Sequence, residues 1–336
     1  MVAKDIVGKG NSSGVQKAGS DRSIRWSERA AGLQFSPFLR RIVPTSARDV
    51  LRQARSWILS RYLMRQLPRD KTFEQSEEDA LASKSVSIIV PVHDAPEVTR
   101  RCLMSLQKYA PQAEVVLVDD ASRFEETNGL LGEFSHRNNW KLVRHKIPLG
   151  HSAACAAGAA LATRPYLCLL NSDTVVTPWC WQPVTQTFDD NPEIGVAGPS
   201  TSHAGTSQAL PLANYTRHYL NDSQICEYAS RLSVARNENV LIDIPWVSGF
   251  ALFIRRKIWE DVGGFDLSIP DYGNDVELCV RTQAKAYRVV WVRNSYIHHL
   301  ANASYGNKIG AKQILARIRA AEDDLKRRYG HVRRDV

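Results

Sequence analysis

The stretch YLCLLNSDTVV, residues 166–176, is an apolar run that stops at Asn171, Ser172 and Asp173 before turning apolar again. A short continuous apolar run is typical of a strand that is buried on both faces of a sheet. The polar triplet then marks the point where this strand leaves the core. The stretch therefore predicts a buried strand that delivers a carboxylate, Asp173, to one edge of a sheet.

Similar strand patterns alternate with helix patterns from Ser85 onward. Strands are predicted at 86–92 (VSIIVPV), 114–118 (EVVLV), 140–143 (WKLV) and 166–170 (YLCLL), and helices at 96–110, 124–136 and 151–162. This βαβαβαβ order favours a mainly parallel sheet flanked by helices, with right-handed crossovers. The predicted fold class is therefore α/β, and ligands are expected at the carboxyl ends of the strands.

Three of these strand ends carry acidic or amide side chains. The pairs are His93 and Asp94, Asp119 and Asp120, and Asn171 and Asp173. A lone carboxylate such as Asp94 often serves only as a turn former or a helix cap. Adjacent carboxylates repel each other and a turn needs only one of them, so Asp119 and Asp120 favour a functional interpretation. The strand ends together predict an acidic site along one rim of the sheet.

No glycine-rich phosphate loop of the GxGxxG or GxxxxGK[ST] type follows the first predicted strand. Any phosphate bound at this rim must therefore be neutralised in another way. A divalent cation, held by one or two protein ligands and completed by waters and substrate phosphates, is the usual alternative. Asp173 is placed to hold such an ion.

Six motifs occur in a fixed order over about residues 85–305. They are VSIIVPVHDA, EVVLVDDAS, LLNSDTVV, SGFALFIRRKIWEDVGGFD, GNDVELCVR and IHHLANAS. In this order they resemble the family-2 glycosyltransferases. The resemblance implies a GT-A fold, which is a Rossmann-like nucleotide-diphospho-sugar transferase fold, and inverting transfer from a nucleotide-sugar.

The resemblance also implies roles for single residues. Asp94 and Asp120 would contact the base and the ribose of the donor, and Asp119 and Asn171 belong to the same donor site. Asn171-Ser172-Asp173 would stand for the DxD-type motif of the family, with Asp173 binding Mn²⁺ or Mg²⁺. His299 would be a further metal ligand near the diphosphate. Asp275 would be the catalytic base.

The chain departs from the family pattern at two places. The helix after Gly150 has Cys155 and Ala156 where the family often has Asn, which removes a polar contact to the donor. The acidic pair Glu-Asp of the family is here Asn274-Asp275, so an amide replaces its first carboxylate. This replacement spares the expected base.

Asp275 has competing interpretations. It falls in the first turn of a predicted helix, where the positive end of the helix dipole would keep it ionised. Aspartate at this place also stabilises many helices without any catalytic role, and Glu277 is close enough in sequence to act as the base instead. A histidine after a strand, such as His298 or His299, is often structural rather than a ligand.

Two features suggest an acceptor side. Gly249 opens the predicted strand GFALFI, where a small residue would let a substrate approach the backbone, although a strand glycine is equally often a bulge. The resemblance places the turn at residues 263–266, GGFD, beside the acceptor.

The basic residues are concentrated at the ends of the chain. Residues 1–84 hold 16 Lys and Arg against 9 Asp and Glu, residues 301–336 hold 9 against 4, and the segment between is slightly acidic. A nucleic-acid binder would spread positive charge over its folded surface, so we expect no nucleic-acid partner. Three regions are predicted: a basic, partly disordered extension at 1–84 with an amphipathic helix at about 46–67, a catalytic domain at 85–305, and a basic helix at 306–336.

The extensions allow two interpretations. The helix at 46–67 has an apolar stripe flanked by arginines, so it would either lie on an anionic membrane surface as a peripheral contact or pack on the catalytic domain. Residues 69–84 read as a charged linker. No apolar run reaches the roughly 18 to 20 residues that span a bilayer, and no signal peptide pattern is present. We therefore expect a cytoplasmic protein, in one interpretation at the inner face of the membrane, with its six cysteines reduced in the core.

The sequence thus predicts a metal-dependent inverting glycosyltransferase. It would move a sugar from a nucleoside-diphosphate donor to a hydroxyl group of a glycan or lipid-linked acceptor, as in polysaccharide or glycoconjugate biosynthesis. Two alternatives remain open at this point. One is a nucleotidyltransferase on a similar sheet, and the other is an inactive GT-A-like scaffold attached to a membrane through its basic ends.

Overall fold

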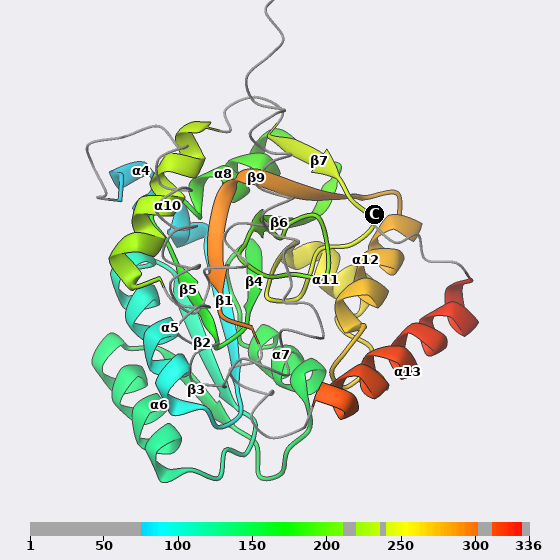
Figure 1. Cartoon of the computed structure of the whole chain (residues 1–336), viewed down its shortest axis with the longest axis horizontal. Helices are drawn as coiled ribbons and strands as arrows, with labels where there is room; N and C mark the ends of the chain where they lie inside the picture. Colours follow the sequence, from blue (N-terminus) through cyan, green and yellow to red (C-terminus); the bar gives the residue numbers. More distant parts are fainter. Residues whose placement is uncertain (1–74, 211–219, 236–239, 302–310, 331–336) are drawn as a thin grey trace, which may run out of the picture. The chain divides into compact units, whose positions relative to one another are not determined.

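The computed structural model describes residues 75–210, 220–235, 240–301 and 311–330 (Figure 1). The predicted helix at 46–67 and most of the N-terminal extension lie outside these residues. None of the helices in the described part of the chain is both long enough and apolar enough to cross a membrane.

The centre of the fold is a nine-stranded sheet in the order β3-β2-β1-β4-β8-β6-β9-β5, with β7 paired to β9. Its strands are β1 (Val86–Val92), β2 (Glu114–Asp119), β3 (Lys141–Arg144), β4 (Tyr166–Leu170), β5 (Thr174–Val176), β6 (Ile194–Ser200), β7 (Leu241–Asp243), β8 (Ala251–Arg255) and β9 (Arg288–His299). The strands β3, β2, β1 and β4 are mutually parallel, and β6 and β9 are parallel to each other. This confirms the predicted mainly parallel α/β fold.

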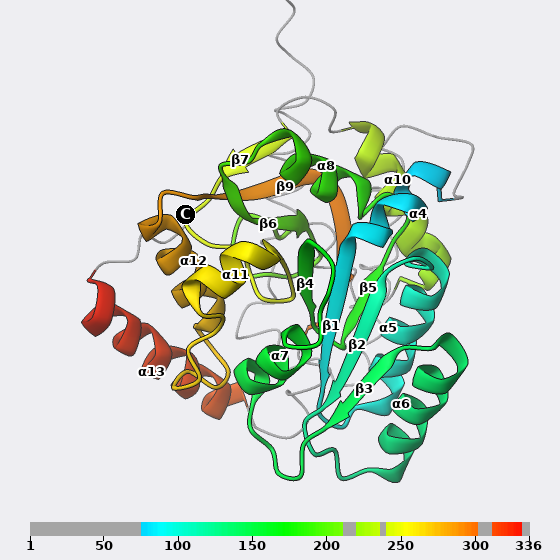
Figure 2. The same cartoon turned by 180° about the vertical axis from the view of Figure 1, so that it is seen from behind.

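Helices cover both faces of the sheet (Figures 1 and 2). They are α4 (Glu77–Ala82), α5 (Pro96–Tyr109), α6 (Glu125–Asn138), α7 (His151–Ala159), α8 (Gln182–Asp190), α10 (Asp222–Ala235), α11 (Arg256–Val262), α12 (Asn274–Ala284) and α13 (Ala311–Tyr329), with a 3-10 turn at Ser83–Ser85. The predicted strands β1, β2 and β4 and helix α5 are confirmed. The third strand lies one residue later than predicted, and α7 ends at Ala159 rather than at residue 162.

The two faces of the sheet explain why its strands are apolar throughout. Successive residues of a strand point to opposite faces, and each face here has its own buried cluster. In β1, Ile88 and Val90 pack beneath α5 and α6, whereas Ile89 packs beneath α7. In β4, Cys168 lies on the first face and Leu169 on the second. All six cysteines are free and buried, as expected of core residues.

The strand β8 runs antiparallel to both β4 and β6. Its beginning therefore lies at the edge where β4 ends, and the Asn171 N–H donates to the Phe250 carbonyl there at 2.9 Å. Gly249 precedes β8 instead of opening it, so the sequence assignment of this glycine to the strand was wrong. His298 and His299 were expected to follow the last strand, but β9 continues through both of them because they pair with Val175 and Thr174 of β5.

Residues 77–85 do not form part of a linker, which corrects the sequence interpretation. The Asp79 carboxylate of α4 is fully buried and accepts hydrogen bonds from the backbone N–H groups of Trp179, Trp181 and Gln182 at 2.8–3.0 Å. The high charge of this segment concealed the structural role, because one of its carboxylates points into the protein and caps a loop.

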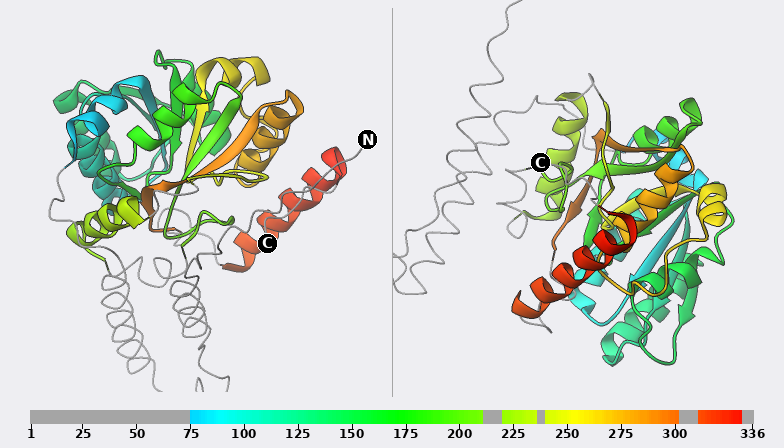
Figure 3. Two further views of the ribbon diagram at one scale, coloured as in Figure 1. Left: turned by 90° about the horizontal axis from the view of Figure 1, so that it is seen from above. Right: turned by 90° about the vertical axis from the view of Figure 1, so that its right-hand side faces the viewer.

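The helix α13 lies beside α12 and the loop that leads into it (Figure 3). Its Leu325 and Ala321 side chains are so close to Gly273 that a β-carbon there would lie 3.2–3.3 Å from them. Gly273 also has φ of +88°, which disfavours other residues. The turn before α12 is therefore held tightly on both counts.

Candidate active site

The carboxyl ends of β1, β2 and β4 meet at one rim of the sheet, as the sequence predicts. The start of β8 and the end of β9 join the same rim, since β8 is antiparallel to β4 and β9 is parallel to β6. The candidate residues Asp94, Asp119, Asp120, Asn171, Asp173 and His299 all lie along it. The start of α12 brings Asp275 to Gly249 at this rim.

Asp94 is fully buried at the end of β1 and has φ of +59°. Its Oδ1 accepts from the backbone N–H groups of Arg123 at 2.7 Å and Phe124 at 3.2 Å, just before α6. The Arg123 guanidinium lies 3.3 Å from Oδ2. Neither α5 nor α6 has a side-chain cap, so Asp94 is not the helix cap that the sequence allowed, and its carboxylate instead fixes the loop between β2 and α6.

The adjacent carboxylates after β2 point to different loops. Asp119 bonds the Ser122 N–H at 2.9 Å and the Arg144 guanidinium at 2.7 Å. Asp120 accepts from the backbone N–H groups of Leu149 at 2.8 Å and Gly150 at 2.9 Å, and its Oδ1 lies 2.7 Å from His145 Nδ1. The two side chains therefore avoid mutual repulsion, and Asp120 shapes the loop that leads into α7.

The structure brings together the two predicted metal ligands, Asp173 and His299. The Asp173 Oδ1 atom lies 3.2 Å from His299 Nε2, and both side chains are largely buried. The other ring nitrogen, His299 Nδ1, lies 2.9 Å from the His203 carbonyl. A carbonyl oxygen only accepts, so Nδ1 carries a proton and donates to it, and Nε2 is the ring nitrogen that faces the Asp173 carboxylate.

This donor set fits a divalent cation. Two cis ligands of an octahedral ion with bonds of about 2.1 Å are separated by roughly 3 Å, close to the observed distance. A backbone carbonyl on the second ring nitrogen is also the usual way to orient a metal-binding histidine. No group of three or more His, Cys, Asp or Glu residues suited to a metal occurs in the described ranges. A cation here would therefore need substrate oxygens or waters to complete its shell.

Asp275 lies in the first turn of α12 and is partly buried. Its Oδ2 accepts from the Gly249 N–H at 2.8 Å, and its Oδ1 accepts from the Val276 N–H at 2.9 Å. A β-carbon on residue 249 would lie 3.4 Å from Oδ2, so the small residue here serves the approach of Asp275. Burial raises the pKa of Asp275 above its usual 3.8, in spite of these hydrogen bonds. We expected the helix dipole to keep this group ionised; desolvation acts in the opposite direction by raising the pKa, and makes the ionised carboxylate a stronger base.

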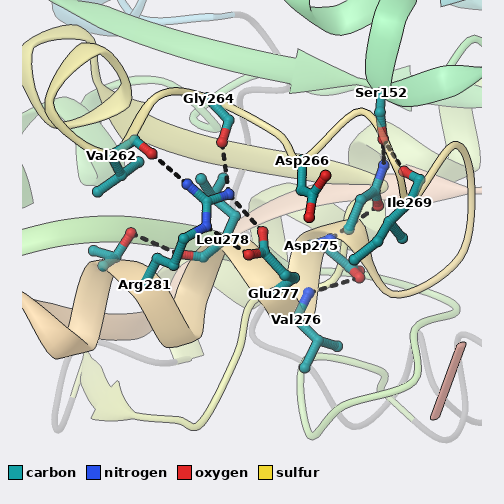
Figure 4. A network of polar contacts seen from close by, with 12 residues as sticks. Ser152, Val262, Gly264, Asp266, Ile269, Asp275, Val276, Glu277, Leu278 and Arg281 are labelled. Carbon is teal, nitrogen blue, oxygen red and sulfur yellow. Dashed lines mark hydrogen bonds and ion pairs between the residues drawn. The ribbon is translucent and has the colours of Figure 1, made fainter. Parts of the chain in front are cut away.

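Glu277 has a structural environment (Figure 4). It is buried and forms a two-point ion pair with Arg281, with N–O distances of 2.6 and 2.5 Å. The Tyr329 hydroxyl of α13 donates to the same carboxylate at 2.7 Å. Arg281 also donates to the carbonyls of Val262 and Gly264. Since its oxygens are bound by a guanidinium and a phenol, Glu277 is a poorer candidate base than Asp275.

Sequence reasoning did not single out His151, the first residue of α7. Its Nδ1 lies 3.0 Å from the Asn274 amide nitrogen, and its ring also interacts with the Asn171 side chain. Gly150, with φ of +91° and no space for a β-carbon against Pro270, sets the turn that places it. The available signal was a histidine directly after a Gly at a predicted helix start, which the sequence pattern alone did not connect to Asn274.

The sequence of this chain matches one protein family and several known proteins. Residues 87–263 match the family described as glycosyl transferase family 2. An uncharacterized protein of Sinorhizobium fredii, y4gI, is 26% identical over 255 residues, which cover 73% of this chain and 27% of that protein. The O-antigen biosynthesis protein RfbC of Myxococcus xanthus is 29% identical over 231 residues, which cover 65% of this chain and 17% of that protein.

The chain therefore spans less than a third of the length of these two relatives. Among solved structures, GalNAc-T7, crystallised with UDP, GalNAc and Mn²⁺, superimposes with a TM-score of 0.50 and 17% identity. The match covers 64% of this chain and 43% of that chain. This likeness confirms the predicted GT-A fold.

Proposed function

The chain belongs to glycosyl transferase family 2, and we propose that it transfers a sugar from a nucleoside-diphosphate donor to a hydroxyl group of a glycan or lipid-linked acceptor. The reaction is proposed to depend on Mn²⁺ or Mg²⁺ and to invert the anomeric centre, as the family resemblance implies. RfbC, by its name, acts in O-antigen biosynthesis, which supports a polysaccharide acceptor.

The observation that carries this proposal is the pairing of Asp173 with His299 at a rim that also holds Asp275. Asp173 and His299 would hold the cation, which when bound neutralises the diphosphate and stabilises the departing nucleoside diphosphate. The carboxylates that fix the neighbouring loops, Asp94, Asp119 and Asp120, are proposed to shape the nucleotide side. Asn171 begins the same turn as Asp173.

Asp275 is proposed to supply the base. An acceptor hydroxyl is a weak nucleophile until its proton is removed, and a positioned carboxylate commonly contributes about 10² to 10⁴ in rate. The hydroxyl oxygen forms a bond to the anomeric carbon while the bond from that carbon to the phosphate oxygen breaks. The proton passes to a carboxylate oxygen of Asp275, each of which retains a lone pair beside its backbone hydrogen bond.

The test begins with binding. UDP-glucose, GDP-mannose and TDP-glucose are added to the full chain with and without Mn²⁺, and the unfolding temperature is measured. A ligand that binds the native state raises that temperature, and we expect a rise with one of these donors that requires the cation. Slow metal-dependent hydrolysis of the same nucleotide-sugar would then distinguish an active transferase from an inactive scaffold. No shift and no hydrolysis with any donor would refute the proposal.

Membrane contact is a separate proposal. The basic amphipathic pattern at 46–67 favours peripheral attachment to anionic lipid, which would keep a cytoplasmic enzyme close to a lipid-linked acceptor. A chain that begins at Gln75 retains Asp79 and its capping contacts, so it should fold. It is expected to lose binding to phosphatidylserine vesicles that the full chain retains. Equal binding of both chains would favour the packed-helix alternative.

A further inference from the structure

The hydrogen bonds around Asn274 determine which way its amide points. The Asp275 backbone N–H, which can only donate, lies 2.8 Å from Asn274 Oδ1. The amide nitrogen therefore faces the other side, where it lies 2.8 Å from Ser152 Oγ and 3.0 Å from His151 Nδ1. Each of its two hydrogens has one partner.

Ser152 fixes the direction of the first of these bonds. Its hydroxyl donates to the Ile269 carbonyl at 2.5 Å, so its oxygen accepts from Asn274 (Figure 4). The second amide hydrogen then points to His151 Nδ1, which must accept it with a lone pair. A neutral ring with a bare Nδ1 carries its proton on Nε2. The network thus selects one tautomer of His151.

The ring also interacts with the Asn171 side chain at the end of β4. With Nδ1 occupied as an acceptor, Nε2–H is the ring donor that remains for Asn171. The imidazole therefore bridges the first turn of α12 and the turn that contains Asp173. The Cys155 thiol, one turn along α7, lies 3.7 Å from Nε2.

Charged groups surround this ring without protonating it. The carboxylates of Asp120, Asp271 and Asp275 face it from the end of β2, the loop before α12 and α12 itself, and each favours the charged ring. Burial outweighs them and lowers the pKa of His151 below its usual 6.5. Burial also raises the pKa of the Cys155 thiol, which stays protonated. A neutral ring is thus consistent with both the hydrogen bonds and the surroundings.

We propose that His151, held by the Asn274 amide as the neutral Nε2–H tautomer, is a positioning residue that ties the Asp275 helix to the Asn171–Asp173 turn. It fixes the separation between the base and the cation ligand, and its catalytic consequence rests on the proposed function. The amide at 274 is essential to this arrangement, because a carboxylate accepts hydrogen bonds and cannot donate one, so Nδ1 would have to carry a proton and the selected tautomer would be lost.

The first arm of the test measures the tautomer and needs no substrate. The full chain is labelled with ¹⁵N-histidine, and the His151 ring signals are identified by their loss in His151→Phe. We expect protonated Nε2 and bare Nδ1 at neutral pH. In Asn274→Asp, which keeps the side-chain shape, Nδ1 should become protonated. A protonated Nδ1 in the wild type, or an unchanged ring in Asn274→Asp, would overturn the proposal.

The second arm measures kinetics with whichever of UDP-glucose, GDP-mannose and TDP-glucose the chain hydrolyses. His151→Phe should lower kcat by about 10- to 100-fold, because a displacement of about 1 Å can cost ~10² in rate. The donor KM should change little. His151→Gln keeps one acceptor and one donor and should recover part of kcat. His136→Phe on the exposed side of α6 is the matched control.

The two arms separate two kinds of failure. If no nucleotide-sugar is turned over, the proposed function fails, and the ¹⁵N spectra still decide whether His151 is the neutral bridge. If His151→Phe raises the donor KM and leaves kcat intact, the residue binds the donor and the positioning role is wrong. If His151→Phe does not fold, His151→Gln is compared with the wild type instead. An unchanged kcat in His151→Gln would then also contradict the positioning role.

Discussion

Asp120 and Asp173 end two strands of the same sheet and are almost equally buried, at 6% and 2% exposed, yet their surroundings differ. Asp120 accepts hydrogen bonds from two backbone N–H groups of the loop before α7, and it also lies 2.7 Å from His145 Nδ1. The Asp173 carboxylate lies 3.2 Å from Nε2 of His299, whose Nδ1 donates to a backbone carbonyl. The β1–β2 side of the rim therefore uses carboxylates to shape loops, whereas the β4–β9 side brings together groups suited to a cation.

The comparison shows what a strand-end carboxylate means. Its position follows from the strand, and its task depends on whether its neighbours are the backbone N–H groups of a loop or a further side chain suited to a metal. Backbone N–H groups stabilise a carboxylate and use the lone pairs of its oxygens. A neighbouring imidazole whose other nitrogen is held by a backbone carbonyl can instead join the carboxylate in binding a cation. The predictions below test this distinction from the largest expected effect to the smallest.

Asp173→Asn should have the largest effect. An amide loses the charge that would hold the cation, and stabilisation of the leaving diphosphate by a metal amounts to several kcal/mol, or about 10³-fold in rate. Steady-state hydrolysis or transfer rates across a Mn²⁺ titration measure the loss. Asp190→Asn on the exposed end of α8 is the control. Near-native activity with unchanged metal dependence in Asp173→Asn would show that the cation is held elsewhere.

Asp275→Asn should lower kcat by about 10²- to 10⁴-fold, because an amide cannot accept the acceptor proton. Donor affinity should stay nearly normal, as measured by calorimetric titration. The matched variant is Glu277→Gln, which leaves Arg281 without its charged partner and should cost about 3 kcal/mol of stability. Turnover by the folded fraction of that variant should persist. A loss of kcat confined to Glu277→Gln would reverse the assignment.

The raised pKa of Asp275 predicts the pH dependence. The folded protein binds this proton more tightly than the unfolded chain does, so ionised Asp275 lowers the free energy of unfolding at neutral pH. That cost disappears as pH falls through the folded-state pKa. The acid limb of kcat/KM should lie above pH 3.8. As the pH falls through that limb, the wild type should become more stable relative to Asp275→Asn. An acid limb below 3.8 would contradict the burial argument.

Much of this architecture could be predicted from the sequence because the strands are apolar throughout. The apolar side chains of residues 86–92 and 166–170 can be buried on both faces only if the strands lie between two layers of helices. The polar residues that follow each strand are then placed at the edge of the sheet. The rim residues Asp173 and His299 came from motif resemblance, and the fold brought them within 3.2 Å. The burial of Asp79 was missed because its neighbours in sequence are exposed charges.

The bridge through His151 could not be predicted for a different reason. Its partners Asn171 and Asn274 are 20 and 123 residues away in the chain, and neither pairing follows a period of a helix or strand. In the sequence, Asn274 was identified only as an amide that replaces the first carboxylate of the family's acidic pair. Its role depends on a hydrogen-bond count that needs coordinates.

Asp120→Asn tests the loop-shaping side of the comparison. The amide keeps one oxygen acceptor, so one of the N–H groups of Leu149 and Gly150 loses its partner, which costs about 1 to 3 kcal/mol. We expect a lower unfolding temperature and a higher KM for the donor, with kcat of the saturated enzyme nearly unchanged. A loss of kcat as large as that of Asp173→Asn would mean that the two sides of the rim share one task.

Tyr329→Phe should have the smallest effect. Burial and the neighbouring Glu277 carboxylate raise the pKa of Tyr329, so its hydroxyl stays protonated and donates at 2.7 Å. Its removal leaves Glu277 paired with Arg281, so the cost should be only about 0.5 to 1.5 kcal/mol. Chemical denaturation measures it, with Tyr287→Phe as the matched control. Because this contact joins α13 to the side of α12 that does not carry the base, kcat should stay within about twofold, well short of the loss expected for a base. A loss of kcat with unchanged stability would place α13 in the catalytic machinery and erase the distinction between Asp275 and Glu277.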